Sequence, residues 1–223
     1  MAVLQLRLND NLFLRDPQNT ELGQRIVEHS IHMIDSLGFE AFTFKKLSLE
    51  IDSTEASIYR YFENKHRLLV YLISWYWAWI DYRIEFETHN LFDPEQKLDS
   101  ALQIITEKKT RDDSFPDIDE EALHRIVISE SDKIYLTKQV DEDNKEGLFR
   151  GYKSVCKKIA KILSEINPDY AYPRALISTS LEAASQQIFF ANHLPSLTEM
   201  SQQENPYEEN LRFIKQTIYS AIK

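Results

Sequence analysis

Apolar residues recur at steps of three and four along the segment that begins at Thr20. This spacing places them on one face of an α-helix and leaves the opposite face polar. Gly38 follows the last of them, at a position where many helices end in a left-handed residue. The pattern therefore predicts an amphipathic helix over residues 20–37. Its apolar positions are Leu22, Ile26, Val27, Ile31, Ile34 and Leu37.

Two short helices and a long one are predicted to follow. Thr43 is suited to cap a helix that runs to Ile51, because a threonine hydroxyl can accept a hydrogen bond from a free N–H group of the first turn. A tight turn separates this helix from TEASIYRYF, which predicts a third helix over residues 54–62. Asn64 is the expected cap of a fourth helix that extends to about residue 88.

The rest of the chain is also predicted to be helical, in longer segments. The run TRDDSFPDID is expected to be a loop, and residues 1–17 an arm that ends at Pro17. Apolar spacing and the proline positions predict helices over 94–109, 119–129 with an extension toward 140, 144–166, 173–194 and 206–222.

The composition agrees with an all-α fold. The 223 residues include only 4 glycines and 7 prolines, too few for the many turns of a sandwich, barrel or propeller. With 43% hydrophobic residues, the chain can still bury a substantial core.

The charge balance and the apolar runs limit the partners of the chain. A net charge of −10 argues against indiscriminate binding of polyanions, although a local DNA-binding patch remains compatible with it. Cys156 is the single cysteine, so no internal disulfide can form. The longest uncharged apolar run, residues 68–80, is shorter than the roughly 18 residues that a membrane span needs. We expect a soluble, cytoplasmic protein that does not enter membranes.

The three N-terminal helices have the lengths of a helix-turn-helix unit. In that arrangement the third helix enters the major groove of DNA and the second crosses the phosphate backbone. The segment also supplies a compact core for the unit. Its members are Ile31, Ile34, Phe39, Phe42, Phe44, Leu47, Ile51, Ile58 and Phe62.

The stretch LGFEAFTFKKLSLEIDSTEASIYRYFENKHRLL resembles the DNA-binding segment of the TetR family of transcriptional regulators. With the first helix, the resemblance covers about residues 18–70. It implies an arm over 1–17, a DNA-binding domain over 18–66 and a ligand-binding and dimerisation domain over 67–223. The matching positions are Gly38-Phe39, Thr43, Leu47, Ile58-Tyr59-Arg60-Tyr61-Phe62, Lys65 and Leu68-Leu69.

The resemblance also implies a mode of action. Members of this family bind a palindromic operator in double-stranded DNA as homodimers, and most are repressors that a small-molecule inducer releases. The present chain departs from the family pattern in the turn, where Ile51-Asp52-Ser53-Thr54 replaces Ala-Gly-Val-Ser, and at Ala56, where glycine is common. Aspartate tolerates the left-handed conformation that a glycine would adopt, so we expect the turn to be kept.

Family roles can be assigned to five residues that face phosphates. Thr43 resembles a phosphate clamp at the start of the second helix, and Lys45 and Lys46 flank it. Tyr59 resembles the phosphate-contacting tyrosine of the recognition helix, and Lys65 would reach another phosphate. Each has a simpler interpretation: Thr43 as a helix cap, Tyr59 as packing, and the lysines as solvated charges.

The recognition helix also offers candidates that face the bases. Thr54, Glu55, Ser57 and Arg60 could reach base edges, and Ala56 would allow close approach to the DNA. Glu55 could equally be an acidic residue that the helix dipole favours in the first turn. Between residues 43 and 67 the net charge is only +1, so we expect modest and salt-sensitive DNA affinity.

The fourth helix carries an unusual run of aromatic residues that could line an effector pocket. Large aromatic side chains with one polar atom suit a bulky apolar or aromatic ligand, although such residues also commonly fill a core. The candidates are Trp75, Tyr76, Trp79, Tyr82 and Phe86.

Helix 173–194 has almost no charged face, which indicates that it is covered on more than one side. With helix 206–222 it could form half of a four-helix dimer interface, or it could be buried within its own chain. The candidates for the interface are Ser178, Ala183, Ala184, Ser185, Ile214 and Ile218.

We expect no catalytic residue, metal or cofactor. Two Glu-x-x-His motifs, at Glu63–His66 and Glu121–His124, lie within the range that chance allows for this composition. The alternative to a regulator is a helical scaffold of the same fold that has lost sequence-specific DNA binding and acts through protein partners.

Overall fold

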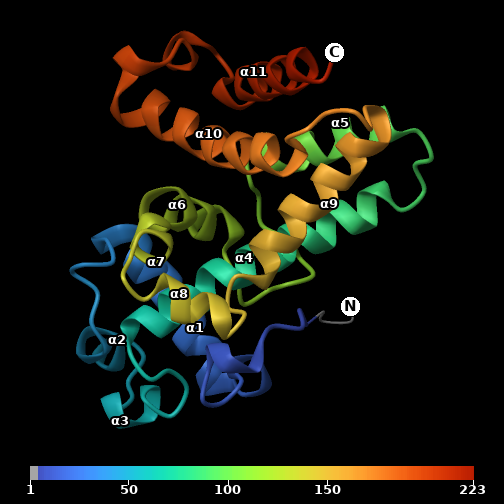
Figure 1. Cartoon of the computed structure of the whole chain (residues 1–223). Helices are drawn as coiled ribbons and strands as arrows, with labels where there is room; N and C mark the ends of the chain where they lie inside the picture. The colour runs from blue at the N-terminus through green and yellow to red at the C-terminus, as the bar shows by residue number, and fades with distance from the viewer. Residues whose placement is uncertain (1–4) are drawn as a thin grey trace. The chain divides into compact units, whose positions relative to one another are not determined.

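The computed structural model describes residues 5–223, and within this range it contains helices, turns and irregular segments but no strand (Figure 1). The all-α prediction is therefore confirmed. The chain divides into two compact units. Unit 1 takes the residues up to Ala78 together with Lys109–Arg150, and unit 2 takes Trp79–Lys108 and Gly151–Lys223. The predicted division at residue 66 concerns function and stays a prediction.

Unit 1 contains the N-terminal helices and a group of helices from the middle of the chain. In order, they are the 3-10 helices η1 (Asp10–Leu12) and η2 (Pro17–Asn19), then α1 (Glu21–Leu37), α2 (Phe44–Glu50), α3 (Glu55–Ile58), the first part of α4 (Lys65–Thr88), α6 (Glu120–Glu130), α7 (Asp132–Tyr135) and α8 (Val140–Lys145).

Unit 2 contains the rest of α4 and the C-terminal helices. These are α5 (Pro94–Thr106), α9 (Arg150–Ile166, which begins at the last residue of unit 1), α10 (Pro173–His193), the 3-10 helices η3 (Pro195–Leu197) and η4 (Met200–Gln202), and α11 (Pro206–Ala221). No helix within residues 5–223 combines the length and apolarity needed to cross a bilayer.

The first helix begins and ends where its sequence predicts. The Thr20 hydroxyl accepts a hydrogen bond from the Gly23 N–H at 3.1 Å, and Gly38 ends the helix with a φ of 78° while its N–H bonds the Ile34 carbonyl. Gly23 has a second role, because a Cβ atom there would overlap the backbone of Pro17. Glycine at this position therefore lets η2 pack directly on α1.

The predicted core of the helix-turn-helix unit is confirmed. Each of its nine members is at most 6% exposed, and Ile31, Phe42 and Phe62 have no exposed surface. Residues 54–62, predicted as the DNA-reading helix, are called the recognition segment from here on. Two edge-to-face aromatic pairs, Phe42 on Phe44 and Phe62 on Tyr71, pack α2 and the end of this segment into the core. The core thus fixes α2 and α3 against α1.

Two predicted helices differ from the structure. The third helix is α-helical only over Glu55–Ile58 and continues as a turn, because the Tyr61 N–H bonds the Ile58 carbonyl three residues back. The helix predicted over 144–166 is interrupted at Gly147, which has a φ of 76° and separates α8 from α9. A residue in the left-handed conformation cannot continue a right-handed helix, so the helix predicted from the periodic pattern begins too early in the sequence.

The described part of the N-terminal arm, residues 5–17, packs on unit 1; residues 1–4 of the predicted arm lie outside the described residues. Leu12 is 1% exposed, and the Leu14 N–H bonds the Tyr61 carbonyl at 2.8 Å. The side chains of Asn9 and Asn11 both donate to the Glu146 carbonyl after α8. The arm therefore connects the recognition segment to the α8 turn.

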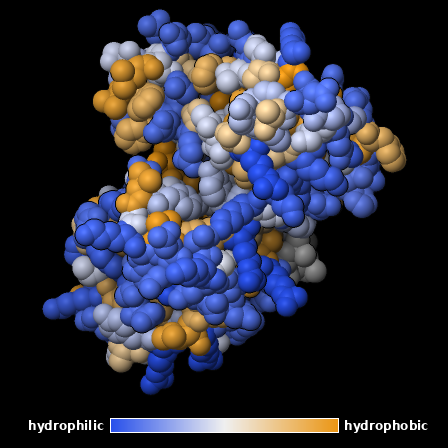
Figure 2. All heavy atoms as spheres, viewed as in Figure 1, coloured by the Kyte–Doolittle hydropathy of each residue, from blue (hydrophilic) through white to orange (hydrophobic). Residues whose placement is uncertain are grey.

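In unit 2, α10 packs on α11 and α5 through apolar side chains. A buried polar contact adds to this packing, because the Asn210 amide of α11 donates to the Ala184 carbonyl of α10 at 2.8 Å. Hydrophobic side chains gather on the surface over the end of α10 and the segment that follows it (Figure 2). Leu194 and Leu197 belong to this patch and are about half exposed.

Candidate nucleic-acid interface

The start of α2 presents three of the predicted phosphate contacts. Thr43 caps this helix by accepting the Lys46 N–H at 3.2 Å, and its side chain remains exposed. Lys45 and Lys46 are also exposed, and the Lys46 ammonium donates to the Ala41 carbonyl at 2.8 Å. The structural role expected of Thr43 is therefore present, and the phosphate contacts stay predictions.

The turn between α2 and α3 is held in a left-handed conformation. Asp52 has a φ of 47°, in the region that aspartate tolerates better than most residues. The Arg25 guanidinium of α1 donates to the Ile51 carbonyl at the end of α2. Arg25 was not predicted, because on a periodic helix it appears as one more polar residue. The pair fixes the turn relative to α1.

The side chains of the recognition segment face solvent. The Thr54 hydroxyl caps α3 by accepting the Ser57 N–H, and it also bonds the Ser57 hydroxyl at 2.9 Å. Glu55, Ala56 and Arg60 are exposed, while Ser57 is half-buried. Apart from this Thr54–Ser57 pair, the polar surface that would meet base edges is not covered by the rest of unit 1.

Tyr59 combines the two roles considered for it. Its ring packs edge-on against Phe44, with centroids 5.0 Å apart, and this contact orients the side chain. The residue is nevertheless 48% exposed. A tyrosine held in this way can present its hydroxyl to a phosphate without a large loss of side-chain entropy.

Lys65 has a structural role that the sequence did not predict. Its ammonium donates to three backbone carbonyls of the preceding loop, those of Phe39, Glu40 and Phe42, at 3.1–3.3 Å. It also lies 4.6 Å from the centre of the Phe39 ring. An ammonium has three N–H groups, so a phosphate contact at Lys65 would require one of these bonds to be exchanged.

Several of the predicted residues surround one hollow of about 270 Å³ on the surface of unit 1. Thr43 and Lys45 border it from α2, Glu55 and Tyr59 from the recognition segment, and Lys65 from α4. The surface over α2 and α3 mixes hydrophilic and apolar side chains (Figure 2), and Leu49 of α2 is 75% exposed. The structure thus brings the predicted phosphate contacts of α2, α3 and α4 together.

The charges near this hollow are closely balanced. Arg67 is paired, at 2.9 Å, with Glu146 and, at 3.9 Å, with Asp143, so its charge is compensated within unit 1. The exposed cations of the segment are Lys45, Lys46 and Arg60, and the exposed acids are Glu50, Asp52, Glu55 and Glu63. A DNA contact at this face therefore depends on placement more than on a strongly positive field.

The aromatic residues of α4 do not share one pocket. In unit 1, Trp75 lines a cavity of about 50 Å³, while Tyr76 stacks on the buried His124 at 5.6 Å. In unit 2, Trp79 is 1% exposed, whereas Phe86 is 71% exposed and stacks on Tyr82. Of the five candidates, Trp75 lines the cavity described here, and the effector role of all five stays a prediction.

The residues proposed for a dimer interface are divided between the interior and the surface of unit 2. Ala184, Ile214 and Ile218 are at most 3% exposed and pack within their own chain. Ser178, Ala183 and Ser185 are partly exposed on α10. The sequence did not single out the large exposed apolar residue of α11, Phe213, which is 42% exposed.

Comparison with known proteins identifies the fold. Similar solved structures include the fatty acid degradation regulator FadR from Bacillus halodurans, with a TM-score of 0.63 and 15% identity over 89% of this chain and 98% of that one. AibR, solved with isovaleryl coenzyme A and operator DNA, has a TM-score of 0.56 and 13% identity over 86% and 95%. A TetR-family regulator from Streptomyces coelicolor has a TM-score of 0.53 and 18% identity over 88% and 97%.

The same comparisons find no matching family model and no matching curated protein. The structural likeness extends over most of the chain and well beyond the N-terminal segment that carries the sequence resemblance. At identities of 13–18%, this likeness establishes the fold of the chain and no more than the fold.

Proposed function

Starting from a chain with the fold of TetR-family regulators, we propose that this protein is a transcriptional regulator that binds a palindromic operator as a homodimer. One observation carries the proposal: the recognition segment is fixed from below by a buried core and leaves Glu55, Ala56 and Arg60 exposed. A helix held in this way can enter the major groove. Its location would be the cytoplasm, where operator DNA is accessible.

We further propose that a small molecule lowers the operator affinity. AibR has this fold and has been solved in complex with isovaleryl coenzyme A and operator DNA. A protein of this fold can therefore bind a small molecule and DNA, which supports the proposal. The effector would act by favouring a separation of the two recognition segments that no longer matches the half-sites. Repression is the expected outcome of DNA binding, and catalysis is no part of the proposed role.

The proposed dimer would form through the exposed face of α10 and α11. Phe213 and the partly exposed small residues Ser178, Ala183 and Ser185 supply apolar surface and close approach. Two-fold symmetry would give two recognition segments about one DNA turn apart, roughly 34 Å. An operator with the same symmetry follows from this arrangement.

The test is selection from a random pool of duplexes at low salt. We expect one palindromic sequence to be enriched, and Ser57→Ala or Arg60→Ala to change which sequence is preferred. Tyr59→Phe should weaken binding to every sequence, while Ser129→Ala, at an exposed residue of α6 outside both proposed interfaces, should have no effect. Enrichment of no sequence would contradict the proposal and favour a scaffold without specific DNA binding, which the balanced charge of the segment supports.

A further inference from the structure

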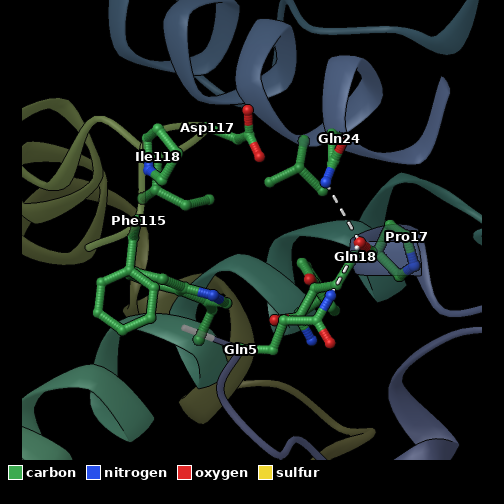
Figure 3. Close-up of a pocket in the computed structure, with 11 residues that line it drawn as sticks. Gln5, Pro17, Gln18, Gln24, Phe115, Asp117 and Ile118 are labelled. Carbon is green, nitrogen blue, oxygen red and sulfur yellow. Dashed lines mark hydrogen bonds between the residues drawn. The ribbon is translucent and has the colours of Figure 1, made fainter. Parts of the chain in front are cut away.

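A cavity of about 50 Å³ lies within unit 1, between residues of α1, of α4 and of two loops (Figure 3). It opens to solvent and is lined by Gln5, by the segment 17–18, by α1, by the first part of α4 and by the loop 115–118. One water molecule needs roughly 10–15 Å³ of such space. The cavity therefore has room for a few water-sized groups, which matches a single six-membered ring better than a polycyclic ligand.

Aromatic side chains form one side of the cavity. Tyr71 and Trp75 of α4 are at most 2% exposed, and Phe115 meets Trp75 edge-on with ring centroids 5.3 Å apart. Faces and edges of such rings bind flat apolar groups. The faces of tryptophan and tyrosine also attract organic cations.

The polar side of the cavity is formed by the side-chain amides of three glutamines. The amides of Gln5 and Gln24 both donate to the Gln18 carbonyl at 3.3 Å, so an N–H of each is already used (Figure 3). The Gln18 amide donates in turn to the Leu6 carbonyl at 3.2 Å. None of the three amide oxygens accepts a hydrogen bond within residues 5–223, so they remain available to a donor.

The charged residue in the lining of the cavity is an acid, Asp117. Asp117 lies on its edge, half-buried and without an ion pair within residues 5–223, and none of the residues that line the cavity is a lysine, arginine or histidine (Figure 3). Burial and then the nearby Asp16 carboxylate raise the pKa of Tyr71. Arg111 lies outside the lining and donates to the carbonyl of Pro116, a lining residue, rather than to the Asp117 carboxylate.

We propose that this cavity binds a small aromatic amine in its protonated form. The ring would lie against Tyr71, Trp75 and Phe115, and the ammonium group would donate to Asp117 and to the glutamine oxygens. The binding step does not rest on the proposed regulator function. Because α1 and α4 form its walls, a bound ligand would act directly beside the recognition segment.

The test measures binding of benzylammonium to the full chain by calorimetry and by protein NMR, without DNA. A ligand of this size is expected to bind with a dissociation constant on the order of 0.1–1 mM. Benzyl alcohol, which has the same ring and no charge, should bind about tenfold more weakly. The Asp117→Asn variant should lose this preference, and Asp113→Asn, an exposed residue of the same loop outside the cavity lining, should retain it.

Three results would overturn the proposal: no saturable binding of benzylammonium, equal binding of the alcohol, or an unchanged preference in Asp117→Asn. Both substitutions lie in a surface loop and leave the apolar core intact, so folding can be verified by circular dichroism. The absence of benzylammonium binding would not change the result expected from the operator selection. The absence of an enriched duplex would likewise not change the result expected from the binding measurement.

Discussion

At the scale of single residues, polar side chains bonded to backbone groups decide the shape of the recognition face. Arg25 donates to the Ile51 carbonyl at the end of α2. Lys65 donates to three backbone carbonyls of the loop that precedes α2. Neither role follows from the sequence, because the partners are backbone atoms 23–26 residues away. The left-handed Asp52, in contrast, was predictable from a local rule and is confirmed.

Replacing Lys65 by methionine should destabilise unit 1. The variant keeps the apolar stem but loses three charge-assisted hydrogen bonds, and we expect the free energy of unfolding to fall by about 1–3 kcal/mol. Urea denaturation measures the change. Lys45→Met is the matched control, because Lys45 is exposed and should affect DNA binding without affecting stability. Equal stability of the two variants would contradict the structural role of Lys65.

Glu120 should make the stability of unit 1 depend on pH. Its carboxyl group has no exposed surface and one oxygen without a partner in the described residues, and burial raises its pKa from the ordinary 4.5 to about 7. The adjacent carboxylates of Asp112 and Asp119 raise the pKa too, while the bond from the Asp112 N–H lowers it. Between pH 4.5 and about 7, Glu120 keeps its proton in the folded state and has lost it in the unfolded state. The contribution of this group to the free energy of unfolding therefore decreases as the pH rises through about 7.

Glu120→Gln cannot ionise and should lack this dependence. We expect the variant to gain stability relative to the wild type between about pH 5 and pH 8, by at most about 3 kcal/mol. Burial lowers the pKa of the neighbouring His124, so this residue makes the stability rise with pH at lower pH. The same histidine is present in the wild type and in the variant, so its effect cancels in the difference between them. A difference that is constant over this range would refute the raised pKa.

At the scale of elements, the sequence predicts what local rules control. The predicted caps Thr43 and Asn64 start α2 and α4, and threonine, aspartate or asparagine also caps α1, α3, α5, α6 and α11. Boundaries that depend on tertiary contacts were missed: α3 ends early at Ile58, where Tyr59 turns onto Phe44, and Gly147 breaks the helix predicted over 144–166.

The same distinction applies to the candidate sites. The recognition face was predictable because its core and its exposed residues alternate within one short segment. The aromatic run on α4 was not resolved by its sequence, because a tryptophan in a core and one beside a cavity have the same local pattern. Only the partners from α1 and from the loop 115–118 distinguish Trp75 from Trp79.

At the scale of the whole molecule, binding of a palindromic operator requires two copies of the chain. Phe213→Glu places a charge on the apolar surface of α11, and we expect it to shift the dimer toward monomer while the helix content is unchanged. Sedimentation analysis measures the association. Arg212→Ala is the control, since this neighbouring residue is exposed and forms an ion pair with Glu209 of its own helix. A fully dimeric Phe213→Glu protein would exclude this face as the interface.

The most direct test of the central claim compares two duplexes of equal length and composition at one salt concentration. One carries the palindrome recovered by selection, and the other carries the same bases scrambled. If the exposed recognition segment reads DNA, the palindrome should bind about a thousandfold more tightly or better. Equal affinity for the two duplexes would contradict the account, however tightly either one binds.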